Sequence, residues 1–399
     1  MQNAQVDFHK TRRLPPYVFE PVNKLKAAAR AAGRDIIDLG MGNPDLPTPQ
    51  LIVDKMCETI QDPRTHRYST SKGITGLRRA QAAYYERRFG VKLNPETQIV
   101  ATLGSKEGFA NMAQAITAPG DVVLVPNPTY PIHSFGFIMS GGVVRSIPAE
   151  PGDAFFEALD RSVRHSIPKP LALILNYPSN PTAYTADIHF YREVVKFAKQ
   201  HDLIVLSDLA YSEIYFDDAP PPSVLEVEGA MDIAVEFTSL SKTYSMPGWR
   251  MGFAVGNERL ISALTRVKSY LDYGAFTPIQ VAATAALKAD DSIIDEARQI
   301  YKARRDVMVD SFTKAGFNVP VPAATMFAWA EIPQAYAHMG SLEFAKMLVE
   351  HADVAVAPGV GFGEYGDNHV RLAFVENEQR VRQAARNIRR FLQATPNAA

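Results

Sequence analysis

The sequence predicts an α/β protein whose larger domain is built on a mostly parallel sheet. Short runs rich in β-branched and aliphatic residues recur through the middle of the chain, with amphipathic helical patterns between them. This alternation is typical of parallel strands joined by crossover helices. After about residue 255 the pattern changes to longer helical stretches with fewer strands, which indicates a separate α+β lobe.

The expected elements of the larger domain alternate in chain order. After Gly104, apolar residues at Phe109, Met112, Ala113 and Ile116 have the spacing of one face of a helix. Strands are expected at Val122–Val125, Leu171–Leu175, Leu203–Leu206, Ile233–Phe237 and Met251–Val255, and further helices at 153–165 and 187–200.

The second lobe is expected to be richer in helix. We predict helices at Glu258–Tyr270, Ser292–Ala315 and Glu378–Leu392, and strands at Met326–Glu331, Val354–Ala357 and Val370–Val375. The opening segment through Pro49 is rich in Pro and Gly and has too little periodic structure to stand alone, so we expect it to pack against this lobe. The predicted division is a large cofactor-binding domain over residues 50–285 and a small domain made of residues 1–49 and 286–399.

Composition excludes several functional classes. The chain of 399 residues is 46% hydrophobic and 21% charged, which is typical of a globular protein rather than a disordered one. Its 42 basic and 43 acidic residues give a net charge of −1, so no general attraction to nucleic acid or anionic lipid is expected. No secretion signal or membrane-spanning run is visible. We therefore expect a cytoplasmic protein with small-molecule substrates, and neither nucleic acid nor membrane as a partner.

A single cysteine limits the chemistry further. Cys57 excludes an intrachain disulfide and a cysteine cluster for zinc or iron–sulfur, and we expect it to be a small buried residue. No group of His, Asp and Glu at metal-ligand spacing accompanies the acidic residue of greatest interest, Asp208. No metal site is predicted.

The most informative stretch runs from Ser239 to Phe253, directly after an expected strand. Open α/β sheets bind ligands at the carboxyl ends of their strands, and the hydroxyls of Ser239 and Ser241 with Arg250 would form an anion site there. Lys242 lies among them, and a desolvated lysine in a cationic pocket has a lowered pKa that suits a Schiff-base nucleophile. An isolated lysine is more often a solvated surface residue, but its neighbours favour the active-site interpretation.

Polar residues also follow two other expected strands. Asp208 ends a buried strand and precedes Tyr211, and a carboxylate at this edge suits a cationic ring nitrogen. A helix cap is the alternative. Asn180 follows the strand over 171–175, although an asparagine before proline is equally consistent with turn chemistry.

Two glycine-containing segments resemble phosphate-binding loops to different degrees. The amides of Gly104, Ser105 and Lys106 begin a helix and can cradle a phosphate, although the segment is not a Walker loop and also fits a capped helix start. The segment Gly361-Phe-Gly-Glu-Tyr-Gly366 matches G-x-G-x-x-G, but a strand rather than a helix is expected after it. We therefore predict no Rossmann-type nicotinamide site.

In this order, Asn180, Asp208, Tyr211, Lys242 and Arg250 resemble the site of the class I/II aminotransferases, fold-type I enzymes that depend on pyridoxal 5′-phosphate. The spacing of eight residues between the lysine and the arginine is that of the family, as is the S-x-S-K sequence before it. The resemblance covers essentially the whole chain.

Three further stretches, Leu14–Phe19, Tyr68–Gly73 and Val125–Ile132, are similar to bacterial alanine (glutamate–pyruvate) transaminases. The usual N-P-T-G of the family reads N-P-T-A from Asn180, which leaves the asparagine in place. Cis peptide bonds at Asn127–Pro128 and Asn180–Pro181 are expected from the resemblance.

The resemblance implies roles for the residues around the cofactor ring. Lys242 would hold the cofactor aldehyde as an imine and later move a proton between the substrate Cα and the cofactor. Asp208 would pair with the protonated ring nitrogen. Asn180 and Tyr211 would hydrogen-bond the phenolic oxygen, and Tyr130 would stack on the ring.

It also implies how the phosphate and the substrate are held. The phosphate would be bound by Ser105, Lys106, Ser239, Ser241 and Arg250. Tyr68 would add a contact from the second subunit of a homodimer. Arg371 would clamp the substrate α-carboxylate, next to Asn180 and the backbone of Gly42. The position of Lys106 is variable in the family.

The resemblance finally suggests a reaction. In aspartate-specific relatives the partner supplies an arginine in the region that corresponds to Tyr270–Phe276, which here contains none. We therefore predict transfer from L-alanine to 2-oxoglutarate, with Tyr17 and Tyr273 as polar groups that accommodate glutamate. LL-diaminopimelate is the alternative donor. A pyridoxal-phosphate-dependent carbon–sulfur lyase and an effector-sensing regulatory protein are the remaining hypotheses.

Overall fold

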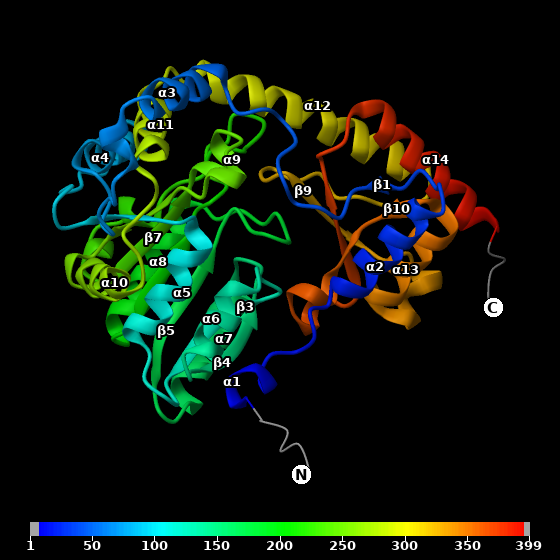
Figure 1. Ribbon diagram of the computed structural model, residues 1–399. Helices are drawn as coiled ribbons and strands as arrows, with labels where there is room; N and C mark the ends of the chain where they lie inside the picture. The colour runs from blue at the N-terminus through cyan, green and yellow to red at the C-terminus, as the bar shows by residue number, and fades with distance from the viewer. Residues whose placement is uncertain (1–7, 395–399) are drawn as a thin grey trace, which may run out of the picture.

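The computed structural model describes residues 8–394 and has two lobes, with helix α12 (Ser292–Lys314) running along both of them (Figure 1). The larger lobe contains a seven-stranded sheet in the order β2-β8-β7-β6-β5-β3-β4. These strands are β2 (Ile99–Thr102), β3 (Val122–Asn127), β4 (Val143–Pro148), β5 (Pro170–Asn176), β6 (Ile204–Asp208), β7 (Ala234–Ser239) and β8 (Gly252–Gly256).

Five strands of this sheet are parallel, and that arrangement gathers polar residues at one edge. Strands β7, β6, β5, β3 and β4 pair in parallel, whereas β8 is antiparallel to both β7 and β2. Asn127, Asn176, Asp208 and Ser239 are the last residues of β3, β5, β6 and β7. Because parallel strands end at the same edge, these polar residues lie along one border of the sheet.

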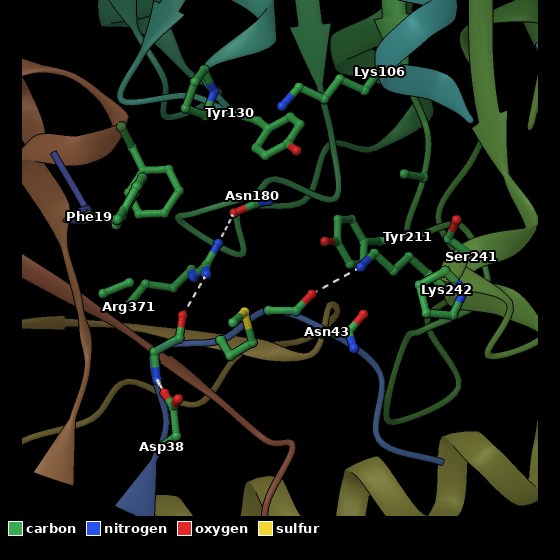
Figure 2. A pocket seen from close by; sticks show the side chains of 18 of the residues that line it. Phe19, Asp38, Asn43, Lys106, Tyr130, Asn180, Tyr211, Ser241, Lys242 and Arg371 are labelled. Atoms are coloured by element: carbon green, nitrogen blue, oxygen red, sulfur yellow. Dashed lines mark hydrogen bonds between the residues drawn. The ribbon is translucent and has the colours of Figure 1, made fainter. Parts of the chain in front are cut away.

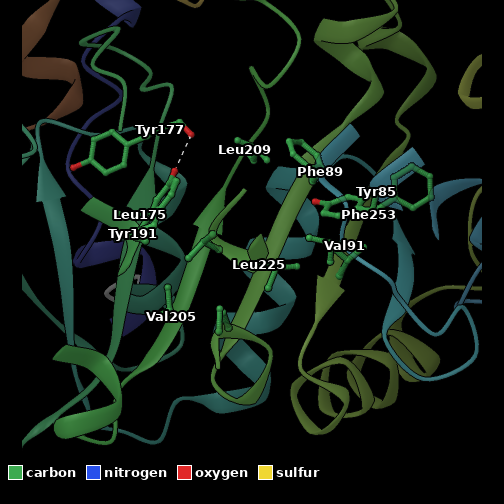
Figure 3. Packing of buried hydrophobic residues seen from close by; sticks show 14 of the residues in the cluster. Tyr85, Phe89, Val91, Leu175, Tyr177, Tyr191, Val205, Leu209, Leu225 and Phe253 are labelled. Carbon is green, nitrogen blue, oxygen red and sulfur yellow. Dashed lines mark hydrogen bonds between the residues drawn. The ribbon is translucent and has the colours of Figure 1, made fainter. Parts of the chain in front are cut away.

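Helices cover both faces of the sheet, which explains why its inner strands are mostly apolar. Alternate residues of a strand point to opposite faces: Leu173 and Leu175 belong to one core cluster and Ile174 to another. The first face is covered by α4 (Thr75–Phe89), α7 (Asp153–His165), α8 (Ile188–Gln200) and α11 (Thr277–Lys288), and the second by α5 (Ser105–Ile116), α6 (Ile132–Met139) and α10 (Glu258–Leu271). Figure 3 shows the first of these cores, in which the Tyr191 hydroxyl donates to the Tyr177 carbonyl oxygen at 3.4 Å.

The smaller lobe contains two small sheets and their covering helices. One sheet is antiparallel, in the order β11-β12-β9, and β1 pairs in parallel with β10. Its elements are β1 (Ile37–Asp38), β9 (Phe327–Glu331), β10 (Val354–Ala355), β11 (Ala357–Pro358), β12 (His369–Ala373), α2 (Glu20–Ala31), α13 (Gly340–Ala352) and α14 (Glu378–Ala394). The opening segment lies against this lobe through α2 and β1. The exact domain boundaries stay a prediction.

Two expectations about local structure are wrong. The strand expected at Val354–Ala357 is two strands, because β10 pairs with β1 whereas β11 pairs with β12. Cys57 is exposed rather than buried, since α3 (Gln50–Ile60) turns Ile52, and not the cysteine, toward the core.

Several elements were not predicted. The edge strand β4 buries only Ile147, and α4 places polar Arg78 and Gln81 on its buried side, so neither has a clear apolar period. Within residues 8–394, no helix has both the length and the apolar character needed to cross a membrane.

Candidate active site

A pocket of about 650 Å³ lies between the carboxyl edge of the large sheet and the smaller lobe. Its lining includes most of the predicted site residues: Tyr17, Gly42, Ser105, Lys106, Tyr130, Asn180, Asp208, Tyr211, Ser239, Ser241, Lys242, Arg250 and Arg371. Tyr68 does not line it. The chain therefore brings together residues that are separated by more than 300 positions in the sequence.

Lys242 lies in the short helix α9 (Leu240–Thr243), which begins where β7 ends. Its Nζ donates a hydrogen bond to the carbonyl oxygen of Gly42 at 3.0 Å and lies 6.0 Å from the centre of the Tyr211 ring (Figure 2). Burial lowers the pKa of Lys242 to about 8, with a further contribution from the positive charges of Arg371 and Arg250. About one tenth of the amine is then neutral at pH 7, against well under one hundredth for an ordinary lysine.

Arg250 closes one end of the pocket beside the first turn of α5. Its Nη1 donates to the Pro247 carbonyl oxygen at 2.8 Å and its Nη2 to that of Leu103 at 3.1 Å. Gly104 has a φ of +86°, and a Cβ there would lie 2.3 Å from Arg250 Nη2. The glycine therefore allows the guanidinium to approach the free N–H groups at Ser105, where an anion would be stabilised.

Hydroxyls and a second cation complete this end of the pocket. Ser239 caps α9 by accepting the backbone N–H of Ser241 at 3.2 Å. Lys106 reaches over the ring of Tyr130, with Nζ 5.7 Å from the ring centre. The set of hydroxyls, helix N–H groups and cations suits a phosphate.

Asp208 is buried at the end of β6 and held by a residue that the sequence did not point to. Its Oδ2 lies 2.9 Å from His133 Nε2, and His133 Nδ1 lies 2.7 Å from Thr129 Oγ1. The backbone N–H of Ala210 donates to the other carboxylate oxygen at 3.3 Å. No motif marked His133, because it is one histidine on α6 and its partner is 75 residues away.

Arg371, on β12, is a buried cation on the smaller-lobe side of the pocket. Its Nη1 donates to Asn180 Oδ1 at 2.7 Å and its Nη2 to the Gly40 carbonyl oxygen at 3.1 Å (Figure 2). The guanidinium carbon lies 4.2 Å from the ring centre of Phe327 and 4.8 Å from that of Phe362.

The buried Nε of Arg371 has no hydrogen-bond partner. Burial lowers the pKa of Arg371 to about 10, so the group remains a cation at neutral pH. A buried cation with an unused donor is suited to bind a carboxylate.

The turns on which Asn180 and Tyr130 stand contain cis peptide bonds. Both expected bonds, Asn127–Pro128 and Asn180–Pro181, are cis, and so is Tyr177–Pro178. Asn176 donates to the carbonyl oxygen of Asn180 at 3.0 Å. Burial raises the pKa of Tyr211, which keeps its hydroxyl protonated.

Tyr68 lies on the outside of the single chain. Its side chain is 86% exposed, and its ring centre lies 4.8 Å from that of Tyr273. Ser71 donates to the carbonyl oxygen of Asp272, so the loop of Tyr68 and the loop after α10 pack on each other.

A buried ion cluster beside the site also lacked a sequence signal. Lys268 is fully buried, with Nζ 2.9 Å from Glu107 and 2.9 Å from Asp272. Glu107 accepts the backbone N–H of Leu103 at 2.8 Å. The cluster therefore joins the start of α5 to the exposed loop after α10.

The segment from Gly361 to Gly366 forms two short 3₁₀ turns followed by β12, as expected. One of its residues, Phe362, nevertheless lines the pocket, which the sequence did not indicate. Across residues 8–394, no group of three or more His, Cys, Asp or Glu residues could hold a metal ion.

Comparison with known proteins identifies the family. Residues 34–388 match the family described as aminotransferase class I and II. The chain is a class I and II aminotransferase.

Named relatives of this aminotransferase span nearly its whole length. It is 80% identical over 386 residues to the putative aminotransferase AatC of Rhizobium meliloti, covering 97% of this chain and 95% of that protein. It is 52% identical over 387 residues to the glutamate-pyruvate aminotransferase AlaC of Escherichia coli, covering 97% and 94%. An LL-diaminopimelate aminotransferase of Moorella thermoacetica is 41% identical over 392 residues, covering 98% and 99%.

A solved structure agrees with the fold of the aminotransferase. Apo-BacF from Bacillus subtilis superimposes with a TM-score of 0.92 at 36% identity, covering 99% of this chain and 100% of that one. The enzyme is therefore a fold-type I, pyridoxal-phosphate-dependent aminotransferase, which acts on amino acids and 2-oxo acids.

The residues of the pocket fit pyridoxal 5′-phosphate. The cofactor presents a phosphate, an aldehyde and a ring nitrogen. The aminotransferase has an anion site at Arg250 and Ser105, a lysine with a lowered pKa at Lys242, and a buried carboxylate at Asp208. The glycine at position 104 leaves the space that an approach to Arg250 requires.

Proposed function

We propose that this aminotransferase transfers the amino group of L-alanine to 2-oxoglutarate, with pyruvate and L-glutamate as products. The observation that carries the proposal is the 52% identity to the glutamate-pyruvate aminotransferase of E. coli over nearly the whole chain. The segment over residues 270–276 contains no arginine, which supports a donor without a second negative charge.

In this proposal Lys242 and Asp208 handle the protons of the reaction, one at the donor Cα and one at the cofactor ring nitrogen. When bound, pyridoxal 5′-phosphate would supply an aldehyde that can carry the amino group and a ring that can accept the electron pair released at Cα. Lys242 Nζ would remove the Cα proton of the donor, because this amine lines the pocket and its pKa is lowered to about 8. Asp208, oriented by His133, would hold a proton on the ring nitrogen of the cofactor.

Substrate is positioned by the smaller-lobe side of the pocket. Arg371 binds the α-carboxylate, with its guanidinium oriented by the Asn180 side chain and flanked by Phe327. Gly42 is required there, since a Cβ would lie 2.9 Å from Phe327 and 3.1 Å from Arg371 Nη2. Tyr17, at the mouth, would meet the far end of glutamate.

The reaction balances over two half-reactions. Alanine loses its amino group and its Cα hydrogen, takes its keto oxygen from one water molecule and leaves as pyruvate. The second substrate, 2-oxoglutarate, gains an amino group and a Cα hydrogen, releases its keto oxygen as one water molecule and leaves as glutamate. Both substrates bind through the same α-carboxylate contact, so they use the pocket in turn.

We also propose a homodimer with shared sites. Three tyrosines are strongly exposed: Tyr68 (86%) and Tyr273 (64%) stand on two loops that pack on each other, and Tyr270 (87%) is in the last turn of α10. An aromatic surface of this kind favours a partner. A second copy would cover it, and Tyr68 would add a hydroxyl to the partner's phosphate site.

LL-diaminopimelate is the second donor to consider, because an aminotransferase of that specificity is 41% identical. The test is kcat/KM for alanine, aspartate, methionine and LL-diaminopimelate, each with 2-oxoglutarate as the acceptor. We expect alanine to lead. An advantage of more than about tenfold for another of the four, roughly 1.4 kcal/mol in the transition state, would refute the alanine assignment.

A further inference from the structure

We propose that Phe362 is a specificity-determining residue, whose ring forms a fixed wall that limits the width of the donor's side chain. The inference rests on the proposed function and names how the same pocket selects narrow donors. It concerns the segment from Gly361 to Gly366, which resembles a nucleotide motif in letters only and so far has no role in the reaction.

The Phe362 ring lies beside the group that would hold the substrate carboxylate. Phe362 lines the pocket, is 5% exposed, and lies with its ring centre 4.8 Å from the guanidinium carbon of Arg371. If Arg371 holds the α-carboxylate, the Phe362 ring lies within one side-chain length of the Cα substituents. It is therefore close enough to contact the donor's side chain.

A second ring extends Phe362 into a wall. The ring centre of Phe19 lies 5.3 Å from that of Phe362 in an edge-to-face arrangement, and Tyr17 lies 5.3 Å beyond Phe19. Figure 2 shows Phe19 on the same side of the pocket as Arg371. Trp329 supports the back of Phe362, with ring centres 6.1 Å apart. Phe362, buried between Phe19 and Trp329, therefore offers an apolar surface with little freedom to move aside.

The backbone on both sides of Phe362 is held in place. A Cβ at Gly361 would lie 2.5 Å from the Phe19 ring, and one at Gly363 would lie 2.1 Å from Asn127 Oδ1. Only glycine allows these approaches, so the two glycines press the segment against Phe19 on one side and against the larger lobe on the other.

Hydrogen bonds tie the segment to the larger lobe and to the cofactor side of the site. The Phe362 carbonyl oxygen accepts the backbone N–H of Thr129 at 2.8 Å, and Asn127 Oδ1 accepts that of Tyr365 at 3.3 Å. Thr129 is also the residue whose hydroxyl meets His133, the partner of Asp208. The wall is therefore anchored to the residues that position the reacting centre.

A rigid wall restricts width more than length. Phe362, Phe19 and Tyr17 all line the pocket, so we expect a methyl side chain to fit beside this wall and an unbranched chain such as that of glutamate to pass along it toward Tyr17. A branched or aromatic side chain would have to displace a ring that has no space to move. The substrate class is therefore α-amino acids with narrow side chains.

The test is the ratio of kcat/KM for leucine to kcat/KM for alanine, with saturating 2-oxoglutarate, in the holoenzyme. We expect Phe362→Ala to raise this ratio by about tenfold or more, and Phe362→Leu to raise it by about threefold. A general disturbance of Arg371 would lower both donors together and leave the ratio unchanged. If Phe362→Ala does not fold, Phe362→Leu carries the test.

Tyr365→Ala is the matched control. Tyr365 is on the same segment, its side chain is 55% exposed, and its contact with Asn127 uses the backbone N–H, which alanine keeps. The leucine-to-alanine ratio of kcat/KM in Tyr365→Ala should equal that of the wild type. A ratio within about twofold of wild type in both Phe362 variants, with the bound-cofactor absorbance intact, would overturn the inference. A wild-type preference for LL-diaminopimelate would refute the alanine assignment but not the role of Phe362. The leucine-to-alanine ratio would still measure how strongly Phe362 limits side-chain width.

Discussion

The reactivity of Lys242 is a property of its surroundings. Burial disfavours the charged amine, and Arg371 and Arg250 add like-charge repulsion, so the pKa falls to about 8. The same two arginines would bind the anionic ends of substrate and cofactor. One pair of charges therefore serves both binding and activation.

The first prediction concerns loading of the cofactor-free protein. Because only the neutral amine attacks the aldehyde, the rate of covalent loading should rise with pH and level off above about pH 8, rather than above the value near 10.4 of an ordinary lysine. Absorbance of the bound cofactor measures this rate. A rate that still climbs about tenfold between pH 9 and pH 10 would contradict the lowered pKa.

Lys242→Ala is the control for that experiment. Borohydride reduction and peptide mapping should find the cofactor on Lys242 in the wild type and no covalent product in the variant. A label on another lysine would refute the assignment.

Among single residues, the sequence pointed to those that stand in a recognisable family motif. Lys242, Asp208 and Arg371 could be found because each resembles a family position at the end of a strand or on one. His133 and Phe362 could not, since their roles depend on which loops the fold brings together. Tertiary contacts of single residues leave no periodic signal in the chain.

At the scale of elements, the predictable parts were those with a simple burial pattern. Strands such as β3 and β6 are buried on both faces and appear as apolar runs, and α7 and α8 have one apolar stripe each. Strand β4 is at the sheet edge, and the buried face of α4 carries polar residues that pair with other elements. Contacts with distant parts of the chain decide the structure of β4 and α4, and the local sequence pattern does not show those contacts.

One such pairing anchors β7, the strand that leads to Lys242. Glu236 is fully buried, and its two carboxylate oxygens accept hydrogen bonds from Tyr85 at 3.0 Å, Ser223 at 2.5 Å, Ser207 at 3.1 Å and the Val224 backbone N–H at 3.2 Å. Burial raises the pKa of Glu236 to about 7, against the opposing effect of these bonds.

The second prediction follows from that pKa. The folded state holds the Glu236 proton more tightly than the unfolded state, so this group's contribution to stability is complete below about pH 4.5 and is lost as pH rises to about 7. The loss is on the order of 3 kcal/mol. Glu236→Gln has no such proton.

Thermal unfolding of both proteins between about pH 5 and pH 8 tests this account of Glu236. The stability of the wild type relative to Glu236→Gln should be greater at the acidic end. The control is Glu157→Gln, at an exposed position on α7, which should follow the wild type throughout. A constant difference between wild type and Glu236→Gln would contradict the linkage.

At the scale of the whole molecule, the pocket is made by two lobes and, in our proposal, by two chains. The larger lobe supplies Lys242 and Asp208, whereas the smaller lobe supplies Arg371. Tyr68 is exposed and does not line the pocket of its own chain, as expected of a residue that serves a partner. The sequence indicated the partner role of Tyr68 only through the family resemblance, because nothing else in the sequence distinguishes it from any other surface tyrosine.

The third prediction uses hybrid dimers. The native mass should be twice the chain mass of 44.0 kDa. In a hybrid of a Tyr68→Ala chain with a Lys242→Ala chain, one site receives both intact residues, from different chains. That hybrid should recover about half of the wild-type activity, although each parent dimer is impaired.

Purified hybrids with a different affinity tag on each chain allow that measurement. Activity no greater than half of the Tyr68→Ala parent would mean that Tyr68 serves its own chain. A monomer in solution would refute shared sites altogether.

The most direct test of the central claim is a half-reaction with isotopically labelled alanine. Holoenzyme is mixed with [¹⁵N]-L-alanine without a 2-oxo acid, the excess is removed, and 2-oxoglutarate is then added. We expect one pyruvate per site in the first step and one [¹⁵N]-glutamate per site in the second. Continued formation of pyruvate with free ammonium in the first step, or no pyruvate at all, would contradict an alanine aminotransferase.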